Sequence, residues 1–177
     1  MELILPSAEY KVSYIEAVKE FQEDHSFPLM ERTYDKLSIP DLEENFEDYV
    51  EKELSGARGE NLPEGYVPQT TYWLVDEGEY VGSVRIRHHI NHEFLKTIGG
   101  HIGYSIRPSA RGKGYGNKIL ELALLKAKEL GIERILVTCD ATNTASRKII
   151  EKNGGVLENQ VPNPETGVDK LRFWIEI

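Results

Sequence analysis

The chain has 177 residues with 40% hydrophobic content, which is enough for one domain with a sizeable core. Its net charge of −9 argues against nucleic acid and anionic membranes as partners, and no apolar run reaches the ~18–20 residues that span a bilayer. The N-terminus lacks the basic start and long apolar core of a signal peptide, so we expect a cytoplasmic protein.

The first half of the chain predicts two helices that follow a short strand. The expected elements are a strand over 3–5, a helix over 7–24, a loop over 26–40, a helix over 41–54 and a loop over 55–68. Ser7 and Asp41 are the predicted caps of the two helices. Acidic residues are in excess between Glu16 and Glu60, which indicates either a solvated helical face or a surface that attracts a cationic substrate.

The second half of the chain alternates strands with helices. A β-rich stretch over 70–75, a turn over 76–79 and a strand over 80–87 predict a β-hairpin. After a turn-like segment over 88–99 we expect a strand over 100–107, a helix over 117–130, a strand over 134–139, a helix that begins at Asn143, a loop over 159–167 and a strand over 170–177. This order predicts a single α/β (α+β layered) domain over 1–177, with a mixed central sheet flanked by helices.

The most informative stretch joins the strand over 100–107 to the helix over 117–130. Gly112, Gly114 and Gly116 permit backbone conformations closed to other residues and allow a ligand to approach the main chain. The free N–H groups of the first helical turn then face an anion, with the helix dipole behind them. Four basic residues surround the turn: Arg107, Arg111, Lys113 and Lys118. The stretch predicts a phosphate site, and the alternative is an ordinary strand-to-helix turn.

Two common phosphate loops do not fit this spacing. The G-x-G-x-x-G fingerprint needs its third glycine one position later, and the Walker loop needs Ser or Thr where Gly114 follows Lys113. The remaining pattern, Arg111-x-x-Gly114-x-Gly116, resembles the coenzyme A pyrophosphate loop of the GNAT superfamily of acyl-CoA-dependent N-acyltransferases. The order of elements over roughly 99–157 is also similar to that family.

The resemblance implies a fold in which the strands on either side of the central helix splay apart. It implies acetyl-CoA as cosubstrate and a small-molecule or peptide primary amine as acceptor. It assigns cofactor binding to the following residues: Ser105, Ile106, Arg111, Gly112, Lys113, Gly114, Tyr115, Gly116, Asn117, Asn143 and Ser146. Helix capping alone also explains the last two. Competing interpretations are an acyl-CoA-binding or sensing module without activity, and an unrelated phosphate-loop enzyme that binds a nucleotide.

Transfer of an acetyl group from a thioester to an amine needs a neutral amine, a stabilised oxyanion and a proton for the leaving thiolate. His88, His89 and His101 are candidates for the base. Strand alternation places Tyr104 on the same side as Ile106, which is the expected cofactor side, and His101 on the other. The resemblance assigns the oxyanion to the backbone N–H of Ile106 or of a neighbour.

The sequence departs from the family pattern in two places. Many members carry a tyrosine seven residues after the helix-opening asparagine as general acid, and that position is Ile150 here. Gly155 stands where the family has an aromatic residue. Either the thiolate leaves unaided, which its ordinary pKa near 8.5 allows, or another group protonates it, and Tyr104 could be that group. We expect the C-terminal strand over 170–177 to be exposed, so that it could pair with the same strand of a second copy in a homodimer.

Cysteine and histidine content argues against a metal site and a disulfide. Cys139 is the one cysteine of the sequence, so no disulfide can form within the chain. It ends an apolar strand, which indicates a buried small side chain rather than a nucleophile. The histidines do not have the spacing of metal ligands, so we expect no metal.

Overall fold

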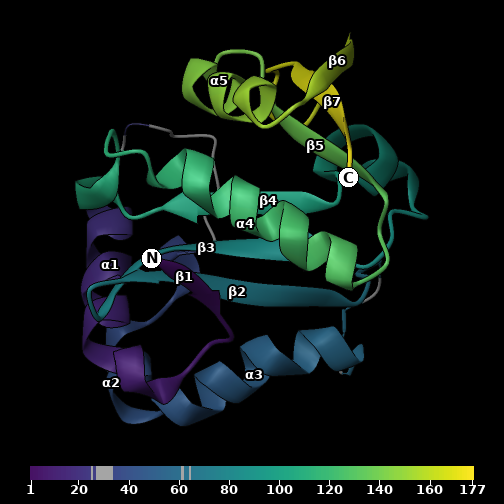
Figure 1. Ribbon diagram of the computed structural model, residues 1–177. Helices are drawn as coiled ribbons and strands as arrows, with labels where there is room; N and C mark the ends of the chain where they lie inside the picture. The colour runs from purple at the N-terminus through teal and green to yellow at the C-terminus, as the bar shows by residue number, and fades with distance from the viewer. Residues whose placement is uncertain (25, 27–33, 61, 64) are drawn as a thin grey trace.

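The computed structural model describes every residue except 25, 27–33, 61 and 64. The described residues form a seven-stranded sheet in the order β1-β2-β3-β4-β5-β7-β6. All neighbouring strands are antiparallel except β4 and β5. Helices cover both faces of this sheet, and α4 crosses in front of it in Figure 1. This mixed, layered architecture confirms the predicted fold class.

The strands are β1 Glu2–Ile4, β2 Gln69–Asp76, β3 Glu79–Arg87, β4 Ile102–Ile106, β5 Arg134–Asp140, β6 Val156–Val161 and β7 Lys170–Glu176. The α-helices are α1 Lys11–Glu23, α2 Ile39–Glu44, α3 Phe46–Arg58, α4 Tyr115–Glu129 and α5 Thr144–Lys152. Shorter 3-10 turns lie at Ala8–Tyr10, Tyr34–Lys36 and Pro108–Ala110, and a π-helical turn at Leu95–Gly99.

The two faces of the sheet carry separate hydrophobic cores. Residues of β2 alternate between them, so that Leu74 packs with α4 and α5 while Trp73 packs with α1 and α3. In the second core the rings of Tyr14 and Trp73 stack at 4.6 Å, and Tyr80 meets both rings edge-on. Both cores therefore fix helices on the sheet, and α4 is held against the strands that precede and follow it.

The predicted helix over 7–24 is confirmed, but the one over 41–54 is two helices. Ser38, not Asp41, caps α2 by accepting the Asp41 N–H at 3.3 Å. Pro40 fits the first turn of that helix, where its missing N–H is not needed. Asn45 interrupts the helix with φ −117° and ψ 37°, and α3 continues into the predicted loop until Gly59 ends it at φ 71°. Of the predicted loop over 26–40, residues 27–33 lie outside the described residues; the described end of it is not all loop, because it contains the 3-10 turn Tyr34–Lys36 and the start of α2 at Ile39.

The predicted hairpin is confirmed, with Glu77 and Gly78 in a tight two-residue turn at positive φ. The loop predicted over 159–167 is wrong at its start, because its first residues belong to β6. This strand was missed because its apolar residues, Val156, Leu157 and Val161, do not alternate with its polar ones. The C-terminal strand is not an exposed edge, since β7 lies between β5 and β6. The predicted turn-like segment over 88–99 ends in the π-helical turn.

The splayed strands that the resemblance implies are β4 and β5. They meet where Ile102 pairs with Val137 and where the His101 N–H donates to the Leu136 carbonyl at 2.7 Å. Beyond that point β4 stays paired with β3 while β5 stays paired with β7, so the two strands diverge, as Figure 1 shows. The glycine turn, Arg111–Gly116, follows this diverging end of β4 after the short 3-10 turn Pro108–Ala110.

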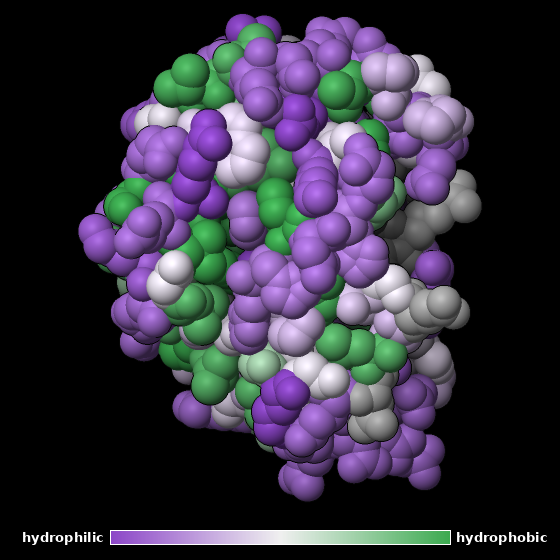
Figure 2. Space-filling view, turned by 90° about the vertical axis from the view of Figure 1, so that its right-hand side faces the viewer, coloured by the Kyte–Doolittle hydropathy of each residue, from purple (hydrophilic) through white to green (hydrophobic). Residues whose placement is uncertain are grey.

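The face drawn in Figure 2 is largely hydrophilic. On the face in Figure 2, hydrophobic residues form separate patches between hydrophilic ones, which is ordinary for a folded domain. None of the described helices combines the length and the apolar character needed to cross a membrane.

Candidate functional site

The three glycines of the turn serve two different structural needs. Gly112 and Gly114 adopt φ 76° and φ 91°, which side-chain-bearing residues rarely adopt. Gly116 has ordinary backbone geometry, but a Cβ atom there would lie 2.5 Å from Cδ1 of Ile149. Two glycines therefore shape the turn, and the third allows α5 to pack closely against the start of α4.

The glycine turn, Arg111–Gly116, presents a row of unbonded amides. The N–H groups of Asn117 and Lys118 donate to the Gly114 carbonyl at 3.1 and 3.3 Å, which begins the hydrogen bonding of α4. The five amides before them, Gly112 to Gly116, have no acceptor within the described part of the chain. They stand at the N-terminus of a 15-residue helix, where the helix dipole favours an anion.

Carboxylates neutralise most of the positive charge predicted around the turn. The pairs are Arg107 with Glu20 at 2.7 Å, Arg111 with Asp24 at 2.5 Å and Lys118 with Glu121 at 2.8 Å. Lys113 is exposed and has no carboxylate within 4.0 Å among the residues described. A bound anion would therefore be held mainly by backbone amides. Lys113 could add positive charge, because no carboxylate of the described residues pairs with it.

The backbone of β4 alternates between its two neighbours. Arg87 N–H bonds the His101 carbonyl and Arg107 N–H bonds the Val81 carbonyl, so the odd-numbered residues turn their backbone groups to β3. Tyr104 and Ile106 therefore turn theirs toward the opening beside β5. The amide of Ser105 faces β3, and its hydroxyl lies 2.9 Å from the Tyr34 hydroxyl on the opposite face of the sheet.

Tyr104 spans the opening between β4 and α5. Its hydroxyl lies 3.0 Å from Oγ of Ser146, in the first turn of α5. The Asn143 side chain caps that helix by accepting the Ser146 N–H at 3.0 Å, as the capping interpretation predicts. Burial raises the pKa of Tyr104 to about 12, against the lowering effect of the Ser146 hydrogen bond. The phenol is therefore protonated, and able to donate, throughout the physiological pH range.

His101 has a structural role at the junction of β4 and β5. The His101 backbone N–H donates to the Leu136 carbonyl, and the His101 ring Nδ1 accepts the Leu136 backbone N–H at 2.9 Å. Burial, together with Arg87 and His89, lowers the pKa of His101 to about 4. The ring is neutral and its lone pair is engaged, so the geometry does not favour His101 as a base. His88 similarly bonds Thr70, at 2.9 Å.

We expect His101 to make stability depend on pH. Its unfolded form binds a proton below about pH 6.5 and its folded form only near pH 4, so the free energy of unfolding should decrease as pH falls between these values. The contribution is of the order of 3 kcal/mol. Urea unfolding at pH 7 and pH 5 measures the part that is lost above pH 5, about 2 kcal/mol. His101→Asn keeps an acceptor for Leu136 but cannot titrate, so an identical pH dependence in both proteins would contradict this assignment.

The two positions that depart from the family pattern, Ile150 and Gly155, are in contact with each other. Ile150 is fully buried in the core between the sheet and the helices, so this position does not face a reaction centre. A Cβ atom at Gly155 would lie 2.8 Å from the Ile150 carbonyl oxygen, which leaves no room for an aromatic side chain. Cys139 is also buried, and burial raises its pKa to about 11, which opposes a nucleophilic role.

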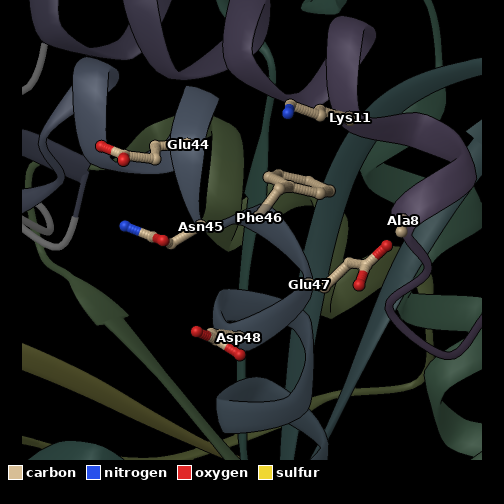
Figure 3. A pocket seen from close by; sticks show the side chains of 7 residues that line it. All are labelled: Ala8, Lys11, Glu44, Asn45, Phe46, Glu47 and Asp48. Atoms are coloured by element: carbon tan, nitrogen blue, oxygen red, sulfur yellow. The ribbon is translucent and has the colours of Figure 1, made fainter.

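A hollow separate from this site lies at the opposite end of α1 from the glycine turn. It measures about 430 Å³ and is lined by Ala8, Lys11, Glu44, Asn45, Phe46, Glu47 and Asp48, as Figure 3 shows. Its lining combines acidic side chains with one lysine and holds no group suited to acyl transfer. Among the described residues, no cluster of three or more His, Cys, Asp or Glu side chains could hold a metal ion.

The sequence did not identify three features of the site: the contact made by Glu20, the contact made by Asp24, and the direction in which the Tyr104 backbone faces. Glu20 and Asp24 contact residues of the turn from 87 or more positions away, which no local pattern reveals. The outward-facing backbone of Tyr104 depends on the register of β4 with β3. A weak signal for the carboxylates was present, because Glu20 and Asp24 have the i, i+4 spacing of one helix face.

The fold and the site can now be set against known proteins. Residues 16–156 match a family model described as an acetyltransferase (GNAT) domain. No curated protein sequence matches the chain. Because the family model spans most of the chain, its match extends well beyond the glycine turn.

Solved structures show the same fold at low sequence identity. The microcin C7 self-immunity acetyltransferase MccE, in complex with acetyl-CoA and AMP, has 18% identity and a TM-score of 0.67, over 99% of this chain and 91% of that one. The ribosomal L7/L12 α-N-protein acetyltransferase RimL, in complex with coenzyme A, has 18% identity and a TM-score of 0.68, over 99% and 93%. A ribosomal-protein-alanine N-acetyltransferase from Brucella melitensis has 15% identity and a TM-score of 0.66, over the full length of both chains.

Proposed function

This chain belongs to the GNAT acetyltransferase family, and on that premise we propose that it transfers an acetyl group from acetyl-CoA to a primary amine by direct attack in a ternary complex. The observation that carries the proposal is the row of five unbonded amides, Gly112 to Gly116, beside the divergence of β4 and β5. A diphosphate suits such a row, because its oxygens accept several N–H groups at once.

The described residues fit coenzyme A at both ends of the proposed site. The glycine turn would hold the diphosphate, with Lys113 adding charge from the surface. The outward N–H and carbonyl of Tyr104 and the outward N–H of Ile106 would pair with the amides of the pantetheine arm, in the way that a further strand pairs with a sheet edge; the Ile106 carbonyl already accepts from Arg111 Nε. In this proposal Tyr104 replaces Ser105, whose amide faces β3.

Acetyl-CoA supplies an acetyl thioester, and the transfer leaves coenzyme A as a free thiol. Within this site a backbone N–H of β4, at Tyr104 or Ile106, would donate to the carbonyl oxygen as negative charge develops there. Tyr104 carries a proton on its phenol oxygen and would give it to the departing sulfur, while Ser146 keeps the phenol oriented. The proton that the amine releases would pass to solvent, and solvent would return one to the Tyr104 phenolate, so that protons balance over the cycle.

The acceptor must reach the site as a neutral amine. An α-amino group has a pKa near 7.7–8.0 and needs no strong base, whereas a lysine ε-amine near 10.4 does. MccE and RimL, the latter described as an α-N-protein acetyltransferase, show that this fold accepts different substrates. We propose a small-molecule or peptide amine here, in the cytoplasm; the homodimer expected from an exposed C-terminal strand loses that support, because β7 is an interior strand.

The direct test is acetyl-CoA-dependent turnover over a panel of amines. The panel comprises a peptide with a free N-terminus, a peptide with a free lysine side chain, a polyamine and an aminoglycoside. We expect thiol release with at least one of them, and mass spectrometry should find the acetyl group on its nitrogen. Thiol release that is equal with and without every amine would contradict the proposal.

A second candidate is an acyl-CoA sensor without activity, which is supported by an isoleucine, unable to donate a proton, at the position of the family's acid, Ile150. Tight coenzyme A binding with no turnover on any amine would support the sensor. A thermal-shift comparison separates both from a nucleotide enzyme, because a ligand that binds the native state raises its melting temperature. A shift with ATP or NAD but none with coenzyme A would overturn both coenzyme A proposals.

A further inference from the structure

Two carboxylates on α1 contact the segment that leads into the glycine turn. Glu20 and Asp24 lie one helical turn apart, Asp24 being the residue that caps α1. Glu20 accepts three hydrogen bonds: from Arg107 Nε at 2.7 Å, from the Ser109 N–H at 2.9 Å and from the Ser109 hydroxyl at 3.0 Å. Asp24 accepts one from Arg111 Nη1 at 2.5 Å. Every second residue from Arg107 to Arg111 is therefore bonded to α1.

These contacts fix both ends of the segment. Arg111 also donates from Nε to the Ile106 carbonyl at 3.2 Å, which ties the last residue of β4 to the first residue of the glycine turn. The Asp24 carboxylate is only 14% exposed and the Arg107 side chain is equally buried, so solvent screens these pairs less than ordinary surface pairs. The Ser26 N–H also bonds Asp24, at 3.0 Å, which orients the carboxylate.

We propose that Glu20 and Asp24 are positioning residues, which hold the glycine turn in the conformation that binds the diphosphate of acetyl-CoA. The inference rests on the proposed function and adds to it two residues that would not touch the cosubstrate. They act through Arg107, Ser109 and Arg111, whose placement sets where the amides of Gly112 to Gly116 point. A turn fixed in advance costs less conformational entropy when a ligand binds to it.

Two other roles for the carboxylates are less consistent with the structure. They are not what holds α1 to the sheet, because that helix already buries Tyr14, Ile15, Ala17 and Val18 in the core. They also do not attract the ligand, since two negative charges beside a diphosphate oppose binding directly. Their contribution to affinity must then come through the shape of the turn. If so, removing the two negative charges should weaken coenzyme A binding, whereas a purely electrostatic effect would strengthen it.

The experiment measures the dissociation constant of coenzyme A by calorimetry for the wild type, Glu20→Gln, Asp24→Asn and the double variant. We expect the double variant to bind about tenfold more weakly, and each single variant to lie between it and the wild type. Glu23→Gln is the matched control. It removes the same charge from the same end of α1, but Glu23 has no hydrogen bond or ion pair within the described chain, so its affinity should stay at the wild-type value.

Kinetics separate positioning from general loss of structure. With acetyl-CoA, the double variant should show a raised KM and a kcat within about twofold of the wild type at saturation. With S-acetylpantetheine, which lacks the diphosphate, its KM should not change. Equal or tighter coenzyme A binding in the double variant, or an equal rise in KM with both donors, would overturn the inference. Absence of coenzyme A binding by the wild type would instead overturn the proposed function, and this inference with it.

Discussion

Gly114→Asp should abolish acetyl-CoA binding, with a dissociation constant raised at least about a hundredfold. The new Cβ meets nothing within 4 Å, so the substitution does not force a clash with the fold. The backbone φ of 91° at Gly114 is unfavourable for a residue with a side chain, by roughly 1–2 kcal/mol. The added carboxylate would also stand within the row of amides, where it repels a diphosphate by several kcal/mol at short range. Calorimetric titration with coenzyme A measures the loss.

Two further variants separate the causes of that loss. Gly131→Asp places the same residue at another open glycine with φ 77°, at the far end of α4, and should leave coenzyme A affinity unchanged. Gly114→Asn keeps the shape of the aspartate without its charge, and should bind with intermediate affinity. A Gly114→Asp protein that still binds coenzyme A as tightly as the wild type would place the diphosphate outside the glycine turn.

Tyr104→Phe should lower kcat by about 10²–10³-fold and change the KM for acetyl-CoA little, because it removes a proton donor and leaves the ring in place. Steady-state kinetics on the best amine of the panel measures both values. The matched control is Tyr72→Phe, which removes a hydroxyl from a tyrosine that packs against the same core on β2. A Tyr104→Phe enzyme with wild-type kcat would show that the thiolate leaves without this acid.

The pKa of Tyr104 adds a pH signature to the same role. Because burial raises this pKa to about 12, the proton-donating form is complete at neutral pH and declines only as pH approaches 12. The rate should therefore rise as the amine loses its proton and then stay level to at least about pH 10.5, with no alkaline fall due to this acid. A fall in kcat near pH 9 that is absent from Tyr104→Phe would contradict the assigned pKa.

The glycine turn could be predicted from sequence because its geometry is local. Left-handed backbone at Gly112 and Gly114, and the start of α4 directly after them, follow from residue type and spacing within a few positions. The third glycine has a different origin. Gly116 is small because Ile149 of α5 packs against it, and that contact between separate helices cannot be seen in the spacing.

Other features depend on pairings between distant segments. The partner of Arg111 is Asp24, 87 residues earlier, and the roles of neighbouring β4 residues follow from the register with β3. Ser105 was a reasonable prediction for the cofactor, but the register turns its amide away from the opening. The strand β6 was missed for a related reason, because its pairing with β7 and not its own composition makes it a strand.

The central claim is that the amides that begin α4 bind a diphosphate, and a crystal structure of the protein with coenzyme A tests it most directly. The claim predicts phosphate oxygens within hydrogen-bonding distance of the Gly112–Gly116 amides, and the pantetheine arm running along the side of β4 that faces away from β3. Density for coenzyme A lodged at any other surface, with those amides bonded to water alone, would contradict it.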